Sequence, residues 1–300
     1  LPAINYPGTS LDVNYVWGTS AAAFEKGRLK TIAAPSPAAS ITYGYDRFGR
    51  MTQDGNLGYL YDDNDNVTRI TYPGSVIADY GYDFADRQSW LNVTRSFFPV
   101  ESVVSNGTYR PFGPLKSFDF GGGPTITRAT DSRYYVDRIS SSNGLFDWNY
   151  SVDAMGNPTA IDDLSAADQD RTFAYQDYAY FLTSGDGPWG SRDWTYDRIG
   201  NRLTEVRGAT TDAYLYVQVA GHNTSKLAQI VIGGGGGTKT YSYNATGDGT
   251  GTVLGTSTTV YTVNDAHRMS SWTLTGANEM GAYYDGRGLL NLATSPPSSK

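Results

Sequence analysis

The sequence contains no cysteine, few glutamates and lysines, and no long apolar run. Without cysteine the chain cannot form a disulfide, a cysteine-type zinc site or a thiol nucleophile. No stretch approaches the roughly 18 apolar residues that a membrane-spanning helix requires, so the sequence predicts no membrane span. Glutamate and lysine are typical of exposed helices, and only 4 Glu and 6 Lys stand beside 26 Asp and 17 Arg. The composition therefore argues against a helical protein.

Turn-forming and aromatic residues take the place of the missing ones. The 300 residues include 35 Gly and 24 Tyr, and the net charge is −7. Asp, Gly and Asn build turns, and an acidic chain without a basic block is unlike a nucleic-acid-binding protein. We predict a single β domain over residues 1–300, with a sub-boundary near 99–118 between two blocks of repeats. Because the chain begins at Leu1 without a signal-peptide pattern, we interpret it as a segment of something longer.

A tyrosine-rich motif recurs along the chain. It reads Tyr-Gly-Tyr-Asp-Arg-Phe-Gly-Arg-Met-Thr over residues 43–52 and Trp-Thr-Tyr-Asp-Arg-Ile-Gly-Asn-Arg-Leu-Thr over residues 194–204. A third copy covers residues 148–158, and weaker copies share the same spacing. The anchor residues are Tyr43, Tyr45, Asp46, Gly49, Arg50, Tyr59, Tyr61, Asp62, Tyr80, Tyr82, Asp83, Arg87, Trp148, Tyr150, Asp153, Gly156, Trp194, Tyr196, Asp197, Gly200, Asn201, Asp285 and Gly288.

Each copy predicts a β-hairpin. Aromatic residues at positions i and i+2 point to the same face of a strand. The following Asp can accept hydrogen bonds from nearby backbone N–H groups and open a turn, and the Gly three residues later can take a positive φ. With units of about 20 residues, the chain would form roughly 18–20 antiparallel strands, and an open sheet of that size must curl. We therefore predict an all-β fold in which antiparallel hairpins form a spiralled, strongly curved sheet.

These motifs resemble the YD repeats of the RHS/teneurin family, whose signature is Tyr-x-Tyr-Asp-x-x-Gly-Arg-x-Thr. The resemblance runs from about Asn5 to about Leu292, and the segment from Tyr109 to Gly123 resembles an insert between such repeats. It implies that the repeats spiral into a hollow β-shell, which in bacteria commonly encloses a variable C-terminal toxin and in teneurins belongs to an adhesion receptor. Family shells are usually longer. The bacterial self-cleavage segment is not recognisable before Lys300, so no cleavage residues are carried over.

The aspartates invite an acid–base interpretation, because paired carboxylates catalyse glycoside hydrolysis. Their recurrence in register with Gly instead favours turn caps, and on that interpretation Asp46→Asn should cost little. The segment from Asp62 to Asn66 looks like a calcium loop. However, Val67 and Pro73 stand where an EF-hand needs Gly and Glu. We interpret it as a polar hairpin tip, and a calcium site of another kind stays open.

No other motif indicates catalysis. Only two histidines are present, His222 and His267, and the second stands where the repeat would place a glycine in the left-handed region. No Gly-x-Ser-x-Gly elbow appears, and the glycine run 233–237 lacks the spacing of a phosphate-binding loop, so it predicts a hairpin tip. We predict no catalytic residue, no cofactor and no metal ligand.

The aromatic residues have two interpretations. Repeated tyrosines are expected to pack along the inner face of the sheet and to stabilise it by burial. Alternatively, exposed rings such as Trp17, Trp189 or Trp272 could stack on sugars. Six asparagines begin Asn-x-Ser/Thr triplets, which matter only if the source glycosylates its surface proteins. These are Asn66, Asn92, Asn106, Asn149, Asn223 and Asn244.

The sequence thus predicts a non-enzymatic scaffold at the cell surface or outside the cell. It would form a wall segment of an RHS-type shell that encloses or presents another polypeptide, such as a C-terminal toxin. Its expected partners are the rest of a longer polypeptide or copies of itself, with a glycan as a further candidate and no nucleic acid. The alternatives are a self-assembling extracellular filament and an adhesion or carbohydrate-binding module.

Overall fold

The computed structural model describes residues 3–6, 11–34, 40–277, 279–285 and 287–294. Within these residues the structure has 27 strands and a short 3₁₀ turn, η2 (Ala167–Gln169). None of the helical segments in this described part is long and apolar enough to cross a membrane. The predicted all-β fold of antiparallel hairpins is confirmed. The strands outnumber the 18–20 predicted, because hairpins also form where the motif is not recognisable, as in β11 (Leu115–Phe120) and β12 (Thr125–Thr130).

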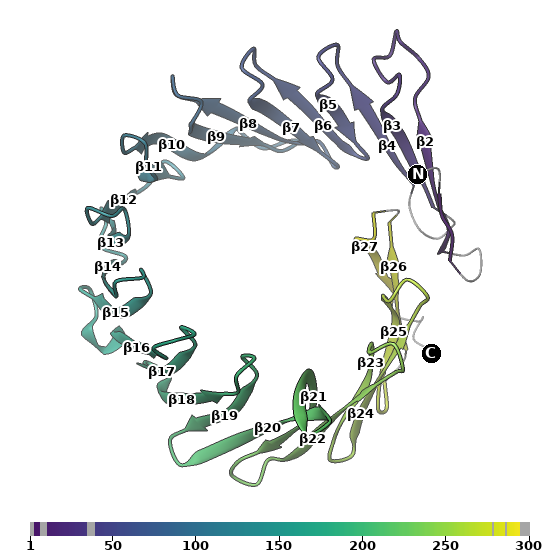
Figure 1. Ribbon diagram of the computed structural model, residues 1–300. Helices are drawn as coiled ribbons and strands as arrows, with labels where there is room; N and C mark the ends of the chain where they lie inside the picture. Colours follow the sequence, from purple (N-terminus) through teal and green to yellow (C-terminus); the bar gives the residue numbers. More distant parts are fainter. Residues whose placement is uncertain (1–2, 7–10, 35–39, 278, 286, 295–300) are drawn as a thin grey trace. The chain divides into compact units, whose positions relative to one another are not determined.

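The chain divides into two compact units, and the second unit consists of residues 44–191. From β5 to β17 each strand pairs antiparallel with the next in the sequence, and Figure 1 shows these strands following a curved path. The strands not yet given are β5 (Met51–Asp54), β6 (Leu57–Tyr61), β7 (Val67–Tyr72), β8 (Val76–Tyr82), β9 (Gln88–Thr94), β10 (Glu101–Tyr109), β13 (Val136–Ser141), β14 (Asp147–Val152), β15 (Pro158–Asp163), β16 (Arg171–Tyr175) and β17 (Leu182–Gly187).

The first unit consists of residues 1–43 and 192–300, and strands β4 and β18 cross the boundaries between the units. Strands β1 to β4 pair in sequence order, as do β18 to β27. These strands are β1 (Ala3–Ile4), β2 (Val13–Trp17), β3 (Leu29–Ala33), β4 (Ile41–Tyr45), β18 (Gly190–Tyr196), β19 (Arg202–Arg207), β20 (Thr210–Val219), β21 (His222–Ile232), β22 (Gly237–Tyr243), β23 (Gly249–Leu254), β24 (Ser257–Val263), β25 (Met269–Leu274), β26 (Met280–Tyr284) and β27 (Leu290–Thr294).

The predicted sub-boundary near residues 99–118 lies inside the second unit. There β10 pairs with both β9 and β11, so the strand ladder is continuous across this segment. The expectation of one domain over residues 1–300 stays a prediction.

The hairpins are bulged next to their turns. In the β6–β7 pair, Leu60 faces Arg69 but Tyr61 faces Val67, so Thr68 is an extra residue on the returning strand. The same shift adjoins the turns of the pairs β8–β9, β12–β13, β14–β15 and β16–β17. Because a bulge increases the local right-handed twist of a strand pair, its repetition accounts for the curvature of the second unit's sheet.

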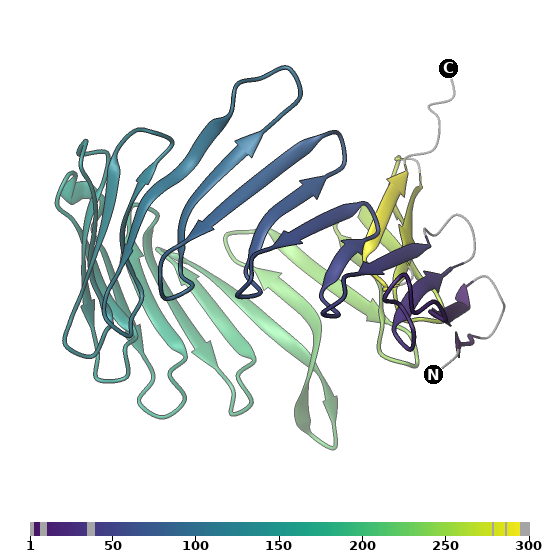
Figure 2. The ribbon, with the colours of Figure 1, turned by 90° about the horizontal axis from the view of Figure 1, so that it is seen from above.

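Little of the sheet is covered. Among the described residues no large side chain is less than 2% exposed. Figure 2 shows the hairpins of the second unit as a single layer of strands, with turns at both edges. The buried hydrophobic residues are Val13, Ile32, Ile41, Tyr43, Ala78, Tyr214 and Ala282.

Candidate functional site

The repeat motif forms a tight turn at Asp46, directly after β4. The carboxylate oxygen Oδ1 of Asp46 accepts hydrogen bonds from the backbone N–H groups of Phe48 (2.9 Å) and Arg50 (3.0 Å). Its other oxygen, Oδ2, accepts one from Nε of Arg50 at 2.6 Å. Gly49 has a φ of 90°, a left-handed value that glycine adopts without steric cost. The carboxylate therefore satisfies two donors of the turn and holds the arginine that precedes the next strand.

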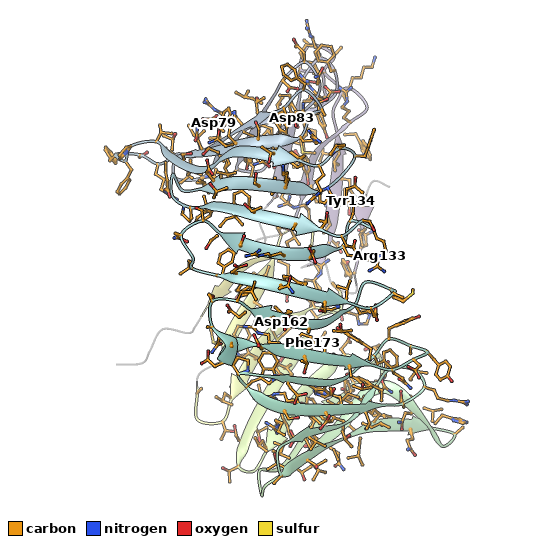
Figure 3. All side chains as sticks on the ribbon, turned by 90° about the vertical axis from the view of Figure 1, so that its left-hand side faces the viewer. Asp79, Asp83, Arg133, Tyr134, Asp162 and Phe173 are labelled. Atoms are coloured by element: carbon orange, nitrogen blue, oxygen red, sulfur yellow. The ribbon has the colours of Figure 1, made fainter. Side chains whose placement is uncertain are left out.

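The same arrangement recurs along one edge of the second unit's sheet. Oδ1 of Asp83 accepts from the N–H groups two and four residues later, and Oδ2 accepts from the Arg87 side chain. Alternate turns of an antiparallel sheet lie on the same edge, and Figure 3 shows Asp83, Arg133 and Tyr134 toward one edge of the strands. We name this edge the capped rim. Its turns are residues 46–50, 62–66, 83–87, 110–114, 131–135 and 153–157. Each begins with an aspartate except 110–114, which begins with Arg110 and is closed by backbone hydrogen bonds.

Where the motif has a glycine three residues after the aspartate, that glycine takes the positive φ of the turn. In the first unit, Asp197 and Asp285 accept backbone hydrogen bonds in the manner of Asp46. Three Asp-capped turns of the capped rim lack the glycine, and there Asp65, Asp86 and Tyr134 adopt positive φ values of 69°, 57° and 68°. The motif glycines all lie in the left-handed region: Gly49 (90°), Gly156 (90°), Gly200 (88°) and Gly288 (86°).

The residue four positions after the aspartate has a defined role that the sequence did not reveal. The side-chain amides of Asn66, Asn157 and Asn201 donate to Oδ2 of their aspartates at 2.8–3.0 Å. In one repeat the two residues are exchanged, because Nδ2 of Asn244 donates to Oδ2 of Asp248 at 2.9 Å. This exchange of Asp and Asn between repeats is visible in the sequence, and it is the signal from which the pairing of the two positions could have been predicted.

The second aromatic residue of the motif ties one repeat to the preceding one. The hydroxyl of Tyr61 donates to the carbonyl oxygen of Met51 at 2.6 Å, and the Arg50 guanidinium lies 4.8 Å from the Tyr61 ring centroid. Tyr82 likewise donates to the carbonyl oxygen of Val67 at 2.7 Å. Further ties of this kind come from Tyr109, Tyr216, Tyr243 and Tyr284.

The remaining motif aromatics are packed on the sheet to different degrees. Tyr43 is buried, and the indole of Trp148 stacks on Phe146 and donates to Oδ2 of Asp163 at 3.0 Å. Trp17 and Trp189, named above as candidates for sugar stacking, are 50% and 45% exposed. The half-buried members are Tyr45, Tyr59, Tyr80, Tyr150, Trp194, Tyr196 and Trp272.

The hydrogen bonds of the turns favour ionised carboxylates. The side chain of Arg87 lowers the pKa of Asp83 from its ordinary value of 3.8 to about 2. The amides of Asn66 and Asn157 lower the pKa values of Asp62 and Asp153. A carboxyl group that ionises this easily is a poor general acid near neutral pH, and its oxygens are already engaged. The geometry therefore fits turn capping.

At the tip of residues 62–66, Asp62 caps its own turn and Asp65 pairs with an arginine of a neighbouring turn. Oδ1 of Asp62 accepts from the backbone N–H groups of Asn64 and Asn66, both at 2.9 Å. Asp65 accepts from the Arg50 guanidinium at 2.8 Å. In the described part of the chain no group of three metal-binding side chains comes together. A calcium site here stays a hypothesis without a supporting cluster.

The two histidines lie in different hairpins. His222 begins β21, whereas Nδ1 of His267 lies 2.9 Å from Oδ2 of Asp248. His267 has a φ of 57°, in the left-handed region expected at that place in the repeat. The Thr246 hydroxyl donates to Asn244 or Asp248 and forms no hydrogen bond with His267, so the three side chains do not form a nucleophilic triad.

The glycine run forms a hairpin tip between β21 and β22. Gly234 and Gly235 have φ values of 66° and 84°, and the backbone N–H of Gly233 donates to Oδ1 of Asp212 at 2.8 Å. An N–H group that is already bonded to a carboxylate is not directed at a phosphate.

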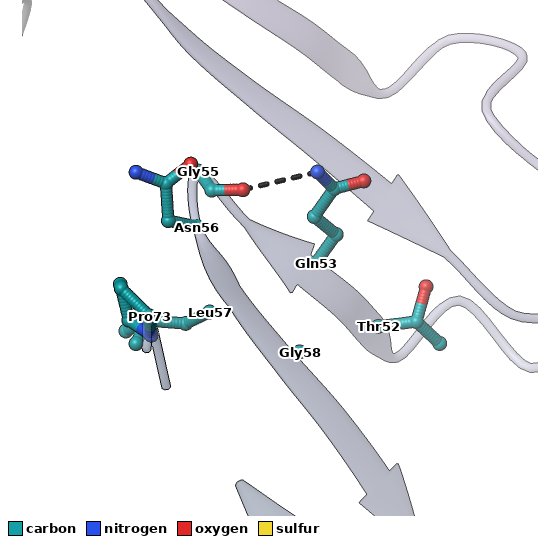
Figure 4. A pocket seen from close by; sticks show the side chains of 7 residues that line it. All are labelled: Thr52, Gln53, Gly55, Asn56, Leu57, Gly58 and Pro73. Carbon is teal, nitrogen blue, oxygen red and sulfur yellow. Dashed lines mark hydrogen bonds between the residues drawn. The ribbon is translucent and has the colours of Figure 1, made fainter. Parts of the chain in front are cut away.

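Shallow grooves lie on the second unit's sheet, and one adjoins the β5–β6 turn. Figure 4 shows its lining, in which Nε2 of Gln53 donates to the carbonyl oxygen of Gly55 at 3.0 Å. The other lining residues are Thr52, Asn56, Leu57, Gly58 and Pro73, and this groove therefore contains no group that titrates near neutral pH. It offers neither a general base nor a nucleophile activated by one.

Comparison with known proteins gives relatives in sequence. No family model matches the chain. It is 30% identical over 158 residues to the tRNA3(Ser)-specific nuclease WapA of Bacillus spizizenii and to the tRNA nuclease WapA of Bacillus subtilis. Each match covers 47% of this chain and 7% of the relative, so the chain spans a small part of these proteins.

Solved structures share the fold over nearly the whole chain. A crystal structure of TcdB2-TccC3 without its hypervariable C-terminal region matches with a TM-score of 0.67 and 15% identity. This match covers 99% of the chain and 18% of that protein. The Tc holotoxin pore of Photorhabdus luminescens matches with a TM-score of 0.57 and 14% identity, over 95% of the chain and 20% of that protein. At this identity the likeness concerns the fold.

Proposed function

We propose that the chain belongs to the RHS-repeat family, on the strength of its repeats and its fold, and that it is a wall segment of an RHS-type shell that encloses or presents another polypeptide. In this role the chain is non-enzymatic and acts as a barrier, because a continuous strand ladder leaves no free backbone groups between its strands. The observation that carries the proposal is that so little of the sheet is covered.

A sheet that stands alone in water must bury at least one face against another element. Here only seven hydrophobic residues are buried in the described part of a 300-residue chain. Both faces of a single layer are then available to other polypeptide, one to an enclosed chain and the other to solvent or to further repeats.

The capped rim supports the same proposal. Its turns expose Phe84 and Phe112 completely, at 112% and 107% of the reference area, and Phe48 and Met155 by more than half. Exposed apolar side chains that recur along one edge mark a surface that another polypeptide covers. Further repeats of a longer polypeptide, or copies of this chain, are the partners we propose for the rim.

The relatives support an association with toxins. One of the similar structures is a Tc holotoxin pore, and the sequence relatives are named as tRNA nucleases. This chain spans a small part of each, and we propose that any toxic activity belongs to another segment. We propose that the shell is exported and acts outside the cell or at its surface.

Protease protection tests the proposal in the complete natural polypeptide that carries these residues. We expect segments outside the repeats to resist trypsin while the repeats are folded, and to be cleaved within minutes after denaturation. The double variant Phe84→Asp with Phe112→Asp should accelerate cleavage of the protected segment, because charged side chains cannot pack under neighbouring repeats.

Ser132→Asp is the matched control, since it adds a charge to an exposed polar position of the same rim. It should leave protection unchanged. If the segments outside the repeats are cleaved equally fast in the folded and the denatured polypeptide, the proposed enclosure is overturned. It is also overturned if the complete polypeptide has no segment outside the repeats.

A further inference from the structure

A groove of about 630 Å³ lies on the second unit's sheet, across β6 to β9. Four of its side chains form a row, because Leu60 pairs with Arg69, Arg69 with Asp79, and Asp79 with Asn92 on successive strands. Directly paired residues point to the same face, so these side chains stand next to one another on one surface. Trp90 lies two residues before Asn92 on β9 and therefore shares that face.

The indole of Trp90 forms a flat platform at the end of this row. Its partner across the strand pair is Gly81, and a Cβ atom at Gly81 would lie only 1.8 Å from Nε1 of Trp90. The ring therefore lies across the glycine backbone, which no residue with a side chain would permit. Trp90 is still 38% exposed, so the ring face turned away from Gly81 is open to the groove.

Polar groups are fixed beside the platform. Nε of Arg69 donates to Oδ1 of Asp79 at 2.5 Å, and Nη2 donates to Oδ2 at 3.1 Å. This bidentate pair holds both side chains in place while 42% of Arg69 and 25% of Asp79 stay exposed. The side-chain amide of Asn92 has no hydrogen-bond partner among the described residues, so it offers two donors and an acceptor to a ligand.

We propose that this groove binds a neutral carbohydrate. The apolar C–H face of a sugar ring would pack on Trp90, and its hydroxyls would bond to Asn92 and to the outer atoms of the Arg69–Asp79 pair. Adjacent positions on one face lie about 5–7 Å apart, so a single sugar unit reaches both kinds of group. An anionic ligand is disfavoured, because Asp79 already neutralises Arg69.

This inference is independent of the wall role, and the platform was not recognised in the sequence. The candidates for sugar stacking in the sequence are exposed aromatic rings, whereas Trp90 becomes a platform because a glycine faces it on the neighbouring strand. The pairing of Gly81 with Trp90 is a long-range feature that a single strand does not reveal.

A neutral glycan array, followed by fluorescence titration with the best oligosaccharide, tests the proposal on the whole chain. Asn92→Ala should weaken binding by about tenfold, because it removes the hydrogen bonds of one polar group. Trp90→Leu should weaken it at least as much, since leucine still covers Gly81 but offers no flat face. Thermal melting of each variant shows whether it is folded.

Tyr178→Ala is the matched control, since it removes an exposed aromatic ring from the β16–β17 turn, outside the groove. It should leave the affinity unchanged. The proposal is overturned if no neutral glycan on the array binds. It is also overturned if Trp90→Leu and Asn92→Ala leave the binding affinity unchanged. Either result would leave the wall role as it stands.

Discussion

At the residue scale, a capping aspartate pairs with a side-chain donor, which stands four positions later in most turns but two positions later at Arg133 and Arg287. Asp153 uses one oxygen for two backbone donors and the other for the amide of Asn157 at 2.9 Å. Asn244 and Asp248 make the same contact with the two side chains exchanged. In both of these turns the pair therefore consists of one carboxylate and one donor, in either order.

Exchanging the pair in a repeat tests this requirement. Asp153→Asn should lower Tm by about 2–4 °C, because two amides then face each other. Asn157→Asp should lower it further, since two carboxylates would repel. The double exchange should recover most of the loss, as measured by circular dichroism. A double variant that melts no higher than Asn157→Asp alone would show that the pair does not hold the turn.

The contacts of Asp46 change one expectation from the sequence. Capping of the backbone alone predicts that Asp46→Asn costs little, because an amide oxygen can still accept from the backbone N–H groups. In the structure, however, Oδ2 of Asp46 also accepts from Arg50. Asparagine at this position would place an amide N–H₂ or a neutral oxygen against the guanidinium, so we now expect a measurable loss of stability.

Acid should weaken the turns in a defined window. The pKa of Asp83 is about 2 in the folded chain, below the ordinary 3.8. A lowered pKa means that this contribution to stability is complete above about pH 4 and is lost as the pH falls toward 2. We expect Tm to fall over this range, and to fall less in Asp83→Asn. An equal fall in that variant would contradict the assignment.

At the scale of the hairpin, the tyrosine ties join successive repeats. Tyr82→Phe removes the hydroxyl that donates to the carbonyl oxygen of Val67 and leaves the ring in place. We expect the free energy of unfolding to fall by about 1 kcal/mol in urea titrations. Tyr178→Phe is the control, because Tyr178 is 91% exposed and has no such partner. Similar losses in both variants would argue against the ties.

The hairpins could be predicted from the sequence because their signals are local. Aromatic residues at i and i+2, followed by Asp and Gly, specify a strand and its turn within eight residues, as in residues 43–50. The tyrosine hydrogen bonds and the Trp90 platform could not be predicted. The bond from Tyr61 to Met51 and the pairing of Trp90 with Gly81 both depend on the register between strands. The degenerate hairpins lack the motif, which explains why strands were undercounted.

At the scale of the whole chain, the exposed rim should govern association. The isolated chain is expected to form species larger than one copy in light scattering, because Phe84 and Phe112 are fully exposed. Phe84→Asp with Phe112→Asp should shift it toward the monomer, and Ser132→Asp should not. Equal particle mass in all three proteins would mean that the rim is not an association surface.

Cryo-electron microscopy of the complete natural polypeptide would show whether the chain forms part of a wall around another polypeptide. We expect the strand ladder to continue into further repeats, Phe84 and Phe112 to be covered by neighbouring chain, and density to be enclosed by the sheet. A map in which the capped rim faces solvent and the sheet encloses nothing would contradict the wall role.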